Sequence, residues 1–241
     1  MKIEIDTHSH TLVSGHAYNT IREMAQMASE KGLKGLAITE HAPKMPGSVG
    51  LYYFQNLRVV PREMYGVRLL LGTELNIMDR EGTIDLPESV VEELDISIAS
   101  IHPPCYVGER TKEVITETFL NVMKKECVDI IGHPDDGRFP VDYERLVRTA
   151  KETGTLLEVN NGSLNPGGFR QNTKENAKKM LEYCKEYETM VVLGTDAHVD
   201  VSIGDYRYVM EVLEETHFPE ELIVNTSLEK LCSCLKRSRK A

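Results

Sequence analysis

The chain has 241 residues, 41% of them hydrophobic and 27% charged, which is the composition of a single soluble globular domain. Its formal net charge is −10 and it has no tryptophan, so neither a basic groove nor an aromatic platform for nucleic acid is expected. No stretch is apolar enough for a signal peptide or a membrane-spanning helix, and we therefore expect a cytoplasmic protein with no membrane partner.

The cysteines are odd in number and widely separated, which argues against a disulfide framework. They are Cys105, Cys127, Cys184, Cys232 and Cys234. The last two are close enough in sequence to bind a metal ion, but their surroundings favour surface and core positions of a C-terminal helix. The basic tail that follows, residues 236–241, is expected to fray.

Short apolar runs rich in β-branched residues recur along the chain, and each is typical of a strand buried on both faces of a parallel sheet. In chain order the predicted strands are Lys2–Asp6, Gly35–Thr39, Arg68–Gly72, Ile96–Ser100, Asp129–Gly132, Thr155–Val159 and Met190–Gly194. Between them, amphipathic periodicity predicts helices. These are Tyr18–Lys31, Val141–Thr153, Thr173–Glu188 and Tyr206–Glu215.

Strands that alternate with helices indicate an α/β fold with a parallel sheet and crossover connections. Seven strands fit a distorted, TIM-like (β/α)7 barrel that forms one domain over residues 1–241, and an open doubly wound sheet is the alternative. No glycine-rich phosphate loop follows any predicted strand, which weakens a nucleotide-binding interpretation. The longest irregular stretch, Ala42–Gln55, follows a strand end, where functional loops of such barrels lie.

The histidines are concentrated at one kind of position. Seven of the eight lie at or just past the C-terminal end of a predicted strand, and only His217 does not. Those seven are His8, His10, His16, His41, His102, His133 and His198. Active sites of β/α barrels form at this face from the ends of several strands, so the placement predicts convergence.

Carboxylates accompany these histidines. Asp6, His8 and His10 are spaced to point to one side of an extended segment, and Asp196 and His198 repeat the alternation. Glu40 and Glu74 stand at the ends of two intermediate strands. Taken singly, each residue has an ordinary explanation as a core histidine, a turn cap or a solvated strand end. Taken together, they favour a metal site.

Imidazole-rich coordination suits zinc, manganese or iron better than magnesium or calcium. The seven histidines with Glu74 and Asp196 exceed the ligand needs of one tetrahedral ion and fit two or three ions, with Glu74 as a bridge. Three divalent ions less two carboxylates leave about +4, which favours a phosphate monoester and a metal-activated hydroxide as nucleophile. No serine or cysteine nucleophile is then needed.

Three further residues are candidates around the metal site. Arg170, in the glycine-rich loop after the sixth strand, and Lys44, in the long loop, are candidates for gripping phosphate oxygens. Asp6 is either a direct ligand or a partner that accepts a hydrogen bond from the second nitrogen of a ligand histidine.

These residues resemble the polymerase and histidinol phosphatase (PHP) family. The matching motifs run through nearly the whole chain in family order. They are Asp6-Thr-His8-Ser-His10, His16, Thr39-Glu40-His41, Glu74, His102-Pro103, His133-Pro134 and Gly194-Thr-Asp196-Ala-His198. The compact length, Ser14-Gly-His16-Ala-Tyr18 and Phe218-Pro219-Glu220 look most like the YcdX-type phosphatase branch. The resemblance implies a distorted seven-stranded barrel, a trinuclear site that is usually zinc, and phosphoesterase activity.

The resemblance also implies a division of the ligands. His8, His10, Glu74 and Asp196 would hold the first ion; Glu74, His102 and His133 the second; and His16, His41 and His198 the third. Two departures stand out: segment Ser163–Asn172 matches no substrate-binding pattern, and the chain lacks the additional domains of the polymerase members.

Other functions remain alternatives to a phosphatase acting on a small phosphorylated substrate. A phosphodiesterase or exonuclease would use the same site but should offer a basic or aromatic track. An amidohydrolase would often place a bridging lysine where Glu74 stands. A non-catalytic metal-binding module would have saturated ligands. The natural substrate, the physiological metal, the general acid and any homo-oligomer stay open.

Overall fold

The computed structural model describes residues 1–236 and forms one barrel of parallel strands. Neighbouring strands follow the chain order, and every pair along this path is parallel. The strands are β1 (Ile5–Asp6), β2 (Gly35–His41), β4 (Val67–Asn76), β5 (Ile96–Ser100), β6 (Ile130–Ile131), β7 (Leu156–Asn160) and β8 (Val191–Gly194). A short strand, β3 (Glu63–Met64), pairs antiparallel with the start of β4.

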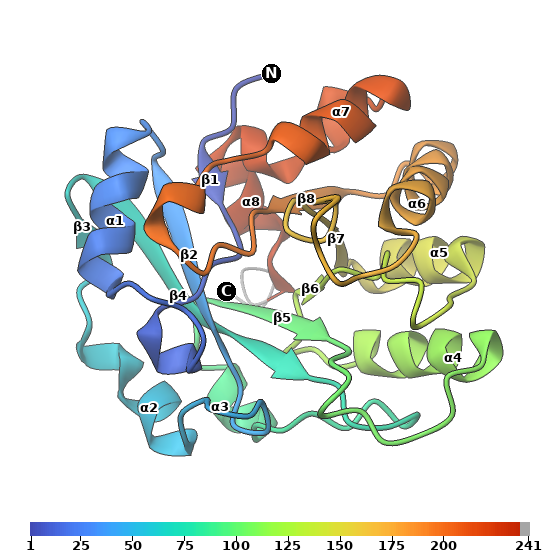
Figure 1. The fold of residues 1–241 in the computed structure, drawn as a ribbon, viewed down its shortest axis with the longest axis horizontal. Coiled ribbons are helices and arrows are strands. Elements are labelled where there is room, and N and C mark those ends of the chain that lie inside the picture. Colours follow the sequence, from blue (N-terminus) through green and yellow to red (C-terminus); the bar gives the residue numbers. More distant parts are fainter. Residues whose placement is uncertain (237–241) are drawn as a thin grey trace.

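Helices pack around these strands, and the last of them packs at the apolar end of the barrel interior (Figure 1). They are α1 (Ile21–Glu30), α2 (Leu51–Asn56), α3 (Glu88–Val91), α4 (Lys112–Met123), α5 (Tyr143–Thr153), α6 (Thr173–Tyr187), α7 (Arg207–Glu215) and α8 (Leu228–Cys234). In the figure α4, α5 and α6 lie on one side of the barrel, opposite α1. Within residues 1–236 no helix combines the length and apolarity needed to cross a membrane.

The seven predicted strands and the barrel architecture are confirmed, and the sequential strand order excludes the doubly wound alternative. The differences concern particular segments. Helix α4 was not predicted because its sequence is rich in β-branched residues, which have lower helix propensity. The irregular stretch Ala42–Gln55 is shorter than predicted, since α2 begins at Leu51.

The seam between β1 and β8 is closed by a side chain instead of a continuous ladder. Asn225 Nδ2 donates to the carbonyls of Ile5 at 3.0 Å and Leu193 at 2.8 Å, and its Oδ1 accepts from the Leu193 N–H at 2.7 Å. Further along, a parallel bridge joins Ser9 to Ala197. Asn225 therefore satisfies backbone groups that a strand pair would otherwise use.

The barrel interior changes from apolar to polar along the strands. On β4, Leu70 packs in an interior apolar cluster, while Glu74, four residues further along the same face, is buried among polar groups. On β7, Leu156 and Glu158 repeat this change. Helix α8 contributes Leu231 to the apolar end, so the polar groups are confined to the carboxyl ends of the strands.

The C-terminal segment differs from the prediction at its first residue. Lys236 is buried, its Nζ donates to the carbonyl of Met123 at 2.9 Å, and its N–H donates to Asp129 Oδ1 at 2.9 Å. The expected fraying is therefore wrong for Lys236, because these hydrogen bonds fix it behind α4. The other residues of the predicted tail, 237–241, lie outside the described residues.

Candidate metal centre

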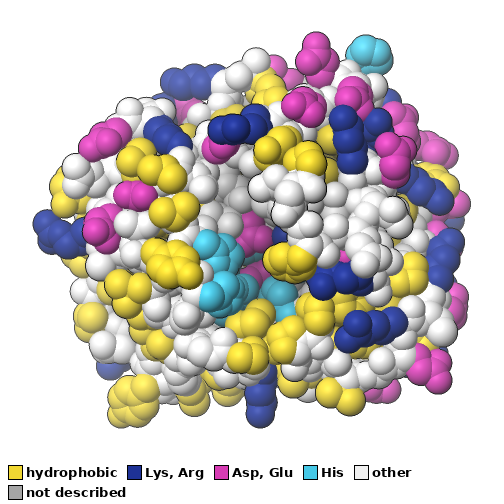
Figure 2. All heavy atoms as spheres, in the orientation of Figure 1, with side chains coloured by type: hydrophobic (Ala, Val, Ile, Leu, Met, Phe, Trp, Pro, Cys, Tyr) yellow, Lys and Arg dark blue, Asp and Glu magenta, His cyan; other side chains and the backbone are white. Residues whose placement is uncertain are grey.

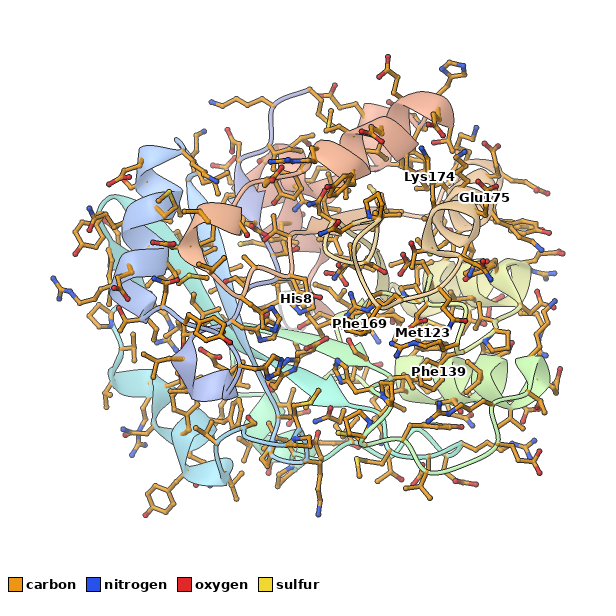
Figure 3. The ribbon with its side chains drawn as sticks, viewed as in Figure 1. His8, Met123, Phe139, Phe169, Lys174 and Glu175 are labelled. Carbon is orange, nitrogen blue, oxygen red and sulfur yellow. The ribbon has the colours of Figure 1, made fainter. Side chains whose placement is uncertain are left out.

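The nine predicted ligands meet in one hollow at the carboxyl ends of the strands. Figure 2 shows histidine side chains gathered in this hollow, with hydrophobic side chains on its rim and basic side chains beside it. His8, labelled in Figure 3, lies buried in the middle of the molecule. The cavity above the cluster has a volume of about 460 Å³. Its lining is His16, His41, Met45, Ile101, His102, Pro103, Pro104, His133, Arg138, Gly162, Phe169, Arg170, Asp196 and His198.

The deepest part of the cluster joins the two histidines after β1 to two carboxylates. His8 Nε2 lies 3.0 Å from His10 Nε2, 3.5 Å from Glu74 Oε1 and 3.6 Å from Asp196 Oδ1. His10 Nε2 lies 3.3 Å from Asp196 Oδ1 and 3.6 Å from Glu74 Oε2. His8, His10 and Glu74 offer ligand atoms within 4.8 Å of one another, and Asp196 adjoins this set through its contacts to both histidines.

Glu74 is at the centre of the remaining contacts. Its Oε1 lies 3.0 Å from His133 Nε2 and 3.3 Å from His102 Nε2, while its Oε2 lies 2.7 Å from His41 Nδ1. The register of β2 with β4 places His41 directly beside Glu74. The two carboxylate oxygens therefore face different imidazoles, which is the arrangement of a bridging ligand.

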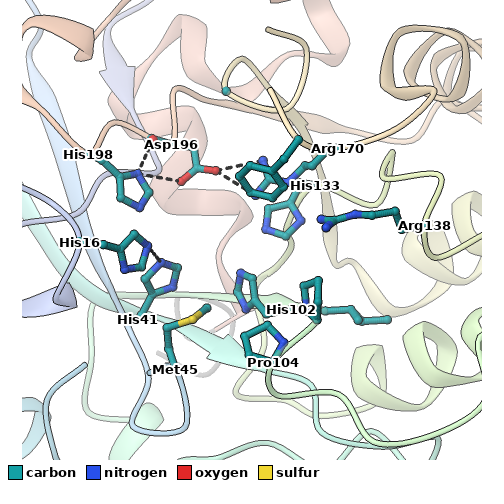
Figure 4. A pocket seen from close by; sticks show the side chains of 14 residues that line it. His16, His41, Met45, His102, Pro104, His133, Arg138, Arg170, Asp196 and His198 are labelled. Carbon is teal, nitrogen blue, oxygen red and sulfur yellow. Dashed lines mark hydrogen bonds and ion pairs between the residues drawn. The ribbon is translucent and has the colours of Figure 1, made fainter. Parts of the chain in front are cut away.

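The third group lies closest to the pocket mouth. His16 Nε2 is 3.2 Å from His41 Nε2, and the His198 ring lies 4.8 Å from the His16 ring and 4.5 Å from the His10 ring. Figure 4 shows His16, His41 and His198 together on one side of the pocket and His102 and His133 on the other. His10 and His41 each belong to two sets of ligand atoms within 4.8 Å of one another, so the groups adjoin.

Residues behind the cluster fix the tautomers of two imidazoles. His8 Nδ1 lies 2.7 Å from the Glu158 carboxylate, which only accepts, so Nδ1 carries the hydrogen. His102 Nδ1 lies 2.8 Å from Asn76 Oδ1, and the Asn76 amide is oriented because its Nδ2 donates to Asp85 at 2.7 Å. When these rings are neutral, each Nε2 atom therefore presents its lone pair to the cluster.

Hydrogen bonds to Nδ1 also fix the tautomers of His10 and His198. Ser14 Oγ donates to Glu40 at 2.6 Å, so it accepts from His10 Nδ1 at 3.2 Å. His198 Nδ1 donates to the backbone carbonyl of Asp196 at 2.9 Å. Glu40, predicted only as a strand-end carboxylate, is thus a buried anchor for the loop that positions His10.

The donor atoms fit a cation. In neutral rings His8 Nε2 and His10 Nε2 both carry lone pairs, and two lone pairs 3.0 Å apart repel unless a proton or a metal ion lies between them. His41 Nδ1 and Glu74 Oε2 are buried without a hydrogen-bond partner in residues 1–236, although only 2.7 Å separates them. Imidazole nitrogens with carboxylate oxygens are the ligands of zinc and similar divalent ions.

The pKa shifts of four cluster residues favour the protonation states that bind metal, namely ionised carboxylates and neutral imidazoles. Burial opposes ionisation of Glu74 and Asp196, but the surrounding imidazoles outweigh it and hold the pKa of both carboxyls well below the ordinary range. Burial and neighbouring imidazoles lower the pKa of His10 well below its usual value, and burial lowers that of His102 to about 4. Both are therefore neutral ligands at neutral pH.

His8 behaves differently. Burial disfavours its charge, but the carboxylates of Glu158, Asp196 and Glu74 outweigh burial and raise the pKa of His8 well above its usual value. Without metal, His8 therefore carries the positive charge that these carboxylates require. A bound cation would replace that proton, so binding of metal releases it.

Asp6 does not face the imidazole nitrogens. It accepts hydrogen bonds from the Thr195 hydroxyl at 2.6 Å and from the backbone N–H groups of Thr195 at 3.1 Å and Gly204 at 3.0 Å. The predicted alternation does not hold for Asp6: β1 ends at this residue, and its carboxylate is taken up by Thr195 and Gly204. The partner role predicted for Asp6 is taken by Glu158, while Asp6 braces the turn that carries Asp196.

The backbone is strained at two ligands. Asp196 has φ 57° and His133 has φ 30°, in the left-handed region that such residues rarely adopt. Each lies two residues past the end of a strand, β6 for His133 and β8 for Asp196. Strain of this kind costs of order 1–3 kcal/mol and persists where the surroundings impose it, often at functional sites.

The two predicted phosphate contacts have different positions. Arg170 lines the pocket, and its Nη1 and Nη2 each lie 3.2 Å from Asp196 Oδ2. Lys44 does not line the pocket: it is exposed, and its N–H donates to Asp85 at 2.8 Å. The long loop is held by this backbone bond in a path that leaves Lys44 outside, so its predicted role is not supported.

Four residues of the site were not predicted. They are Glu158, Asn76, Ser14 and Arg138. Glu158 had a usable signal, a single carboxylate inside the apolar run of β7. The others show their roles only once distant segments are brought together.

The fold and the cluster define the class: a TIM-like barrel protein with a buried, imidazole-rich centre of the metal-binding kind. The model of the PHP domain family matches residues 6–215, and the chain belongs to this family. A protein of Acetivibrio thermocellus named a probable phosphatase is 44% identical over 239 residues, covering 99% of this chain and 98% of the relative.

Two further comparisons agree. A protein of Clostridium novyi, also named a probable phosphatase, is 45% identical over 240 residues, covering 100% of this chain and 97% of the relative. The crystal structure of histidinol phosphate phosphatase from Lactococcus lactis, complexed with zinc, L-histidinol and phosphate, has a TM-score of 0.65 at 20% identity, covering 90% of this chain and 94% of that chain. The likeness to the Lactococcus lactis structure shows that the two proteins share a fold.

Proposed function

We propose that this protein is a metal-dependent phosphatase that hydrolyses a small phosphorylated substrate, with three divalent ions held by the nine ligands. Membership in the PHP domain family and relatives named probable phosphatases support the phosphatase activity. The observation that supports metal dependence most directly is that His41 Nδ1 and Glu74 Oε2 are buried 2.7 Å apart without a hydrogen-bond partner in residues 1–236. Zinc suits the ligands best, since imidazole nitrogens predominate.

The contacts of Glu74 support its bridging role in the division of ligands that the family resemblance implies. Its Oε1 lies toward His8, His102 and His133, and its Oε2 lies toward His10 and His41. Ligand atoms of His10 and His41 also lie within 4.8 Å of each other, so the three groups share neighbours. The group at the pocket mouth, His16, His41 and His198, includes no carboxylate, although His41 contacts Glu74 and His198 lies 3.6 Å from Asp196. An ion held by these three histidines would be accessible from the pocket, which makes it the best position for a phosphate dianion.

Divalent ions at such a centre would neutralise phosphoryl oxygens and lower the pKa of a coordinated water, which makes hydroxide available near neutral pH. The nine ligands would hold these ions, and the ions would supply the hydroxide nucleophile. Hydrolysis would then add water across the bond between phosphorus and the ester oxygen, and would give an alcohol and phosphate. The residues that line the pocket include no serine, threonine or cysteine, which agrees with the absence of a side-chain nucleophile.

Arg170 positions a ligand in this scheme. Its paired contacts to Asp196 Oδ2 leave Oδ1 toward His8 and His10, so the guanidinium orients the carboxylate. Arg170 also lines the pocket, where the remainder of its positive charge faces a bound phosphate. Removal of this side chain would therefore weaken both the first ion and the phosphate.

Metal analysis coupled to a substrate panel tests the proposal. Protein purified without added metal should contain two to three divalent ions per chain, and it should hydrolyse p-nitrophenyl phosphate faster than bis-p-nitrophenyl phosphate. A faster diester reaction would instead indicate the phosphodiesterase alternative. Fully metal-loaded protein that hydrolyses neither these compounds nor any ester of a broad panel would contradict the proposal and leave a metal-binding module.

A further inference from the structure

Two arginines line the pocket, and they have different neighbours. Arg170 is engaged by Asp196, a member of the metal centre. Arg138 comes from the loop after β6 and is not bound to any of the nine ligands within residues 1–236. Figure 4 shows the Arg138 side chain directed into the pocket on the side of His133, away from the group of His16, His41 and His198.

The position of Arg138 is fixed by a carboxylate behind it. Its Nε donates to both oxygens of Asp136, at 3.0 and 2.9 Å, and its Nη2 donates to Oδ2 at 2.6 Å. Asp136 also accepts from the Gln171 N–H, and it does not line the pocket. The Arg138 guanidinium therefore faces the cavity, while the Asp136 carboxylate lies behind it, outside the cavity lining.

One edge of the Arg138 guanidinium remains available. Its Nη1 has no protein acceptor among the described residues, and this side chain is 23% exposed. The ring of Phe169 covers one face of the guanidinium, with 5.0 Å from Cζ to the ring centroid. The Asp136 carboxylate and the Phe169 ring therefore fix the orientation of the guanidinium, and the two N–H groups of Nη1 remain available. Such an arginine is preorganised to bind a planar anion.

The pocket offers no competing negative charge beyond the metal centre. The only carboxylate among its lining residues within 1–236 is Asp196, a proposed ligand. Asp135, next to Asp136, is buried and bonded through both oxygens to the Ser163 hydroxyl. The wall beside His133 therefore presents the guanidinium of Arg138 to the cavity without a carboxylate beside it in the lining, although the whole chain has a net charge of −10.

We propose that Arg138 is a specificity-determining residue that binds a second anionic group of the substrate. The substrate would be a phosphate ester whose leaving group carries a carboxylate or another phosphate, and esters of amino alcohols would be disfavoured. The inference rests on the proposed phosphatase activity. The reacting phosphate occupies the metal centre, and the cavity of about 460 Å³ has room for a leaving group that reaches Arg138.

Three esters with leaving groups of similar length test this charge preference: phosphoglycolate, ethyl phosphate and phosphoethanolamine, which carry an anionic, a neutral and a cationic group. For the zinc-loaded wild-type protein, kcat/KM should fall in that order. One charged hydrogen bond at a partly exposed site corresponds to a preference of about tenfold for phosphoglycolate over ethyl phosphate. The difference should reside mainly in KM, because Arg138 contacts a non-reacting part of the substrate.

Substitutions identify the residue. Arg138→Gln should reduce the ratio of kcat/KM for phosphoglycolate to that for ethyl phosphate to about one, and Arg138→Glu should favour phosphoethanolamine. The matched control is Arg148→Gln. Arg148 also pairs with a carboxylate, Glu144, and stacks on Tyr187, but it lies on the outer face of α5. This control should keep the wild-type ratio.

Several results would overturn the inference. Equal kcat/KM for the three esters in the wild-type protein would do so, as would an equal loss for all three in Arg138→Gln, which would place Arg138 at the reacting phosphate. If no ester is hydrolysed, the proposed phosphatase activity is wrong. Binding of the same three compounds, measured by calorimetry, then tests whether Arg138 binds an anionic group. Tighter binding of phosphoglycolate that Arg138→Gln removes would support the anionic subsite, and indifferent binding would refute it.

Discussion

Glu158 and His8 are 150 positions apart in the chain, yet the Glu158 carboxylate lies 2.7 Å from His8 Nδ1 in the buried interior of the barrel. Glu158 also accepts the His133 N–H at 2.8 Å through its other oxygen. One carboxylate on β7 therefore orients a ligand side chain and the backbone of another ligand. The site depends on this residue although none of its oxygens faces the cluster.

The first prediction concerns Glu158→Gln. The amide can turn its NH₂ group toward His8 Nδ1, which would move the hydrogen of the ring to Nε2 and remove a ligand lone pair. Loss of such a partner typically lowers metal affinity by about 10- to 100-fold. Zinc affinity measured by chelator competition should fall by this factor, together with activity. Glu182→Gln, at an exposed ion pair with Lys185, should change neither.

A second prediction separates the metal positions. Glu74 contacts His102 and His133 through one oxygen and His10 and His41 through the other, so Glu74→Gln should lose the first two ions together and abolish activity. His41→Ala should lose mainly the third ion. Metal per chain measured by mass spectrometry, with circular dichroism to verify folding, checks both. Unchanged metal content and turnover in His41→Ala would show that the proposed division is wrong.

The positions of the ligands could be predicted because they depend on local rules. Parallel strands bring their carboxyl ends to one edge, and the histidines of this chain follow those ends, so the sequence alone indicates their convergence. The same rule identified Glu74, although β4 runs on to Asn76 and places Glu74 within a paired strand. A strand end predicted a few residues early does not change which side chains meet.

The residues that the sequence could not indicate depend on contacts between distant segments. Ser14 orients His10 only because Glu40 accepts the hydroxyl proton. Lys44 and Arg138 are both basic loop residues, but only Arg138 lines the pocket. The difference follows from their carboxylate partners: Asp85 binds the backbone of Lys44, whereas Asp136 binds the guanidinium of Arg138. No periodicity in the sequence encodes such a difference.

The third prediction concerns the barrel seam. Asn225→Ala would leave the buried Leu193 N–H without its acceptor. The carbonyls of Ile5 and Leu193 would each lose one donor but keep the Tyr206 and Thr7 hydroxyls, respectively. One unsatisfied buried group costs about 1–3 kcal/mol, so the free energy of unfolding should fall by about that amount. Urea denaturation of the metal-loaded protein measures it. Thr226→Ala removes one hydroxyl contact to the Ile223 carbonyl and should cost less than about 1 kcal/mol.

The last prediction concerns the stability of metal-free protein as pH falls. Burial lowers the pKa of His102 from its ordinary 6.5 to about 4 in the folded state. Above pH 6.5 the ring is neutral in both states, and its contribution to stability is fully present. Between pH 6.5 and 4 the unfolded chain takes up a proton that the folded protein refuses, so stability is lost as pH falls, by up to about 1.4 kcal/mol per pH unit.

Urea midpoints of chelator-treated protein at pH 7.5 and pH 5 measure this loss. His10 and His16, whose pKa values burial also lowers, act in the same direction, whereas the raised pKa of His8 acts in the opposite one. The His102→Gln variant removes the contribution of this one titrating group. Its urea midpoint should therefore fall less between pH 7.5 and pH 5 than the midpoint of the wild-type protein. His217→Gln, at an exposed position, should follow wild type. An equal pH dependence in wild type and His102→Gln would mean that His102 is not held neutral by burial.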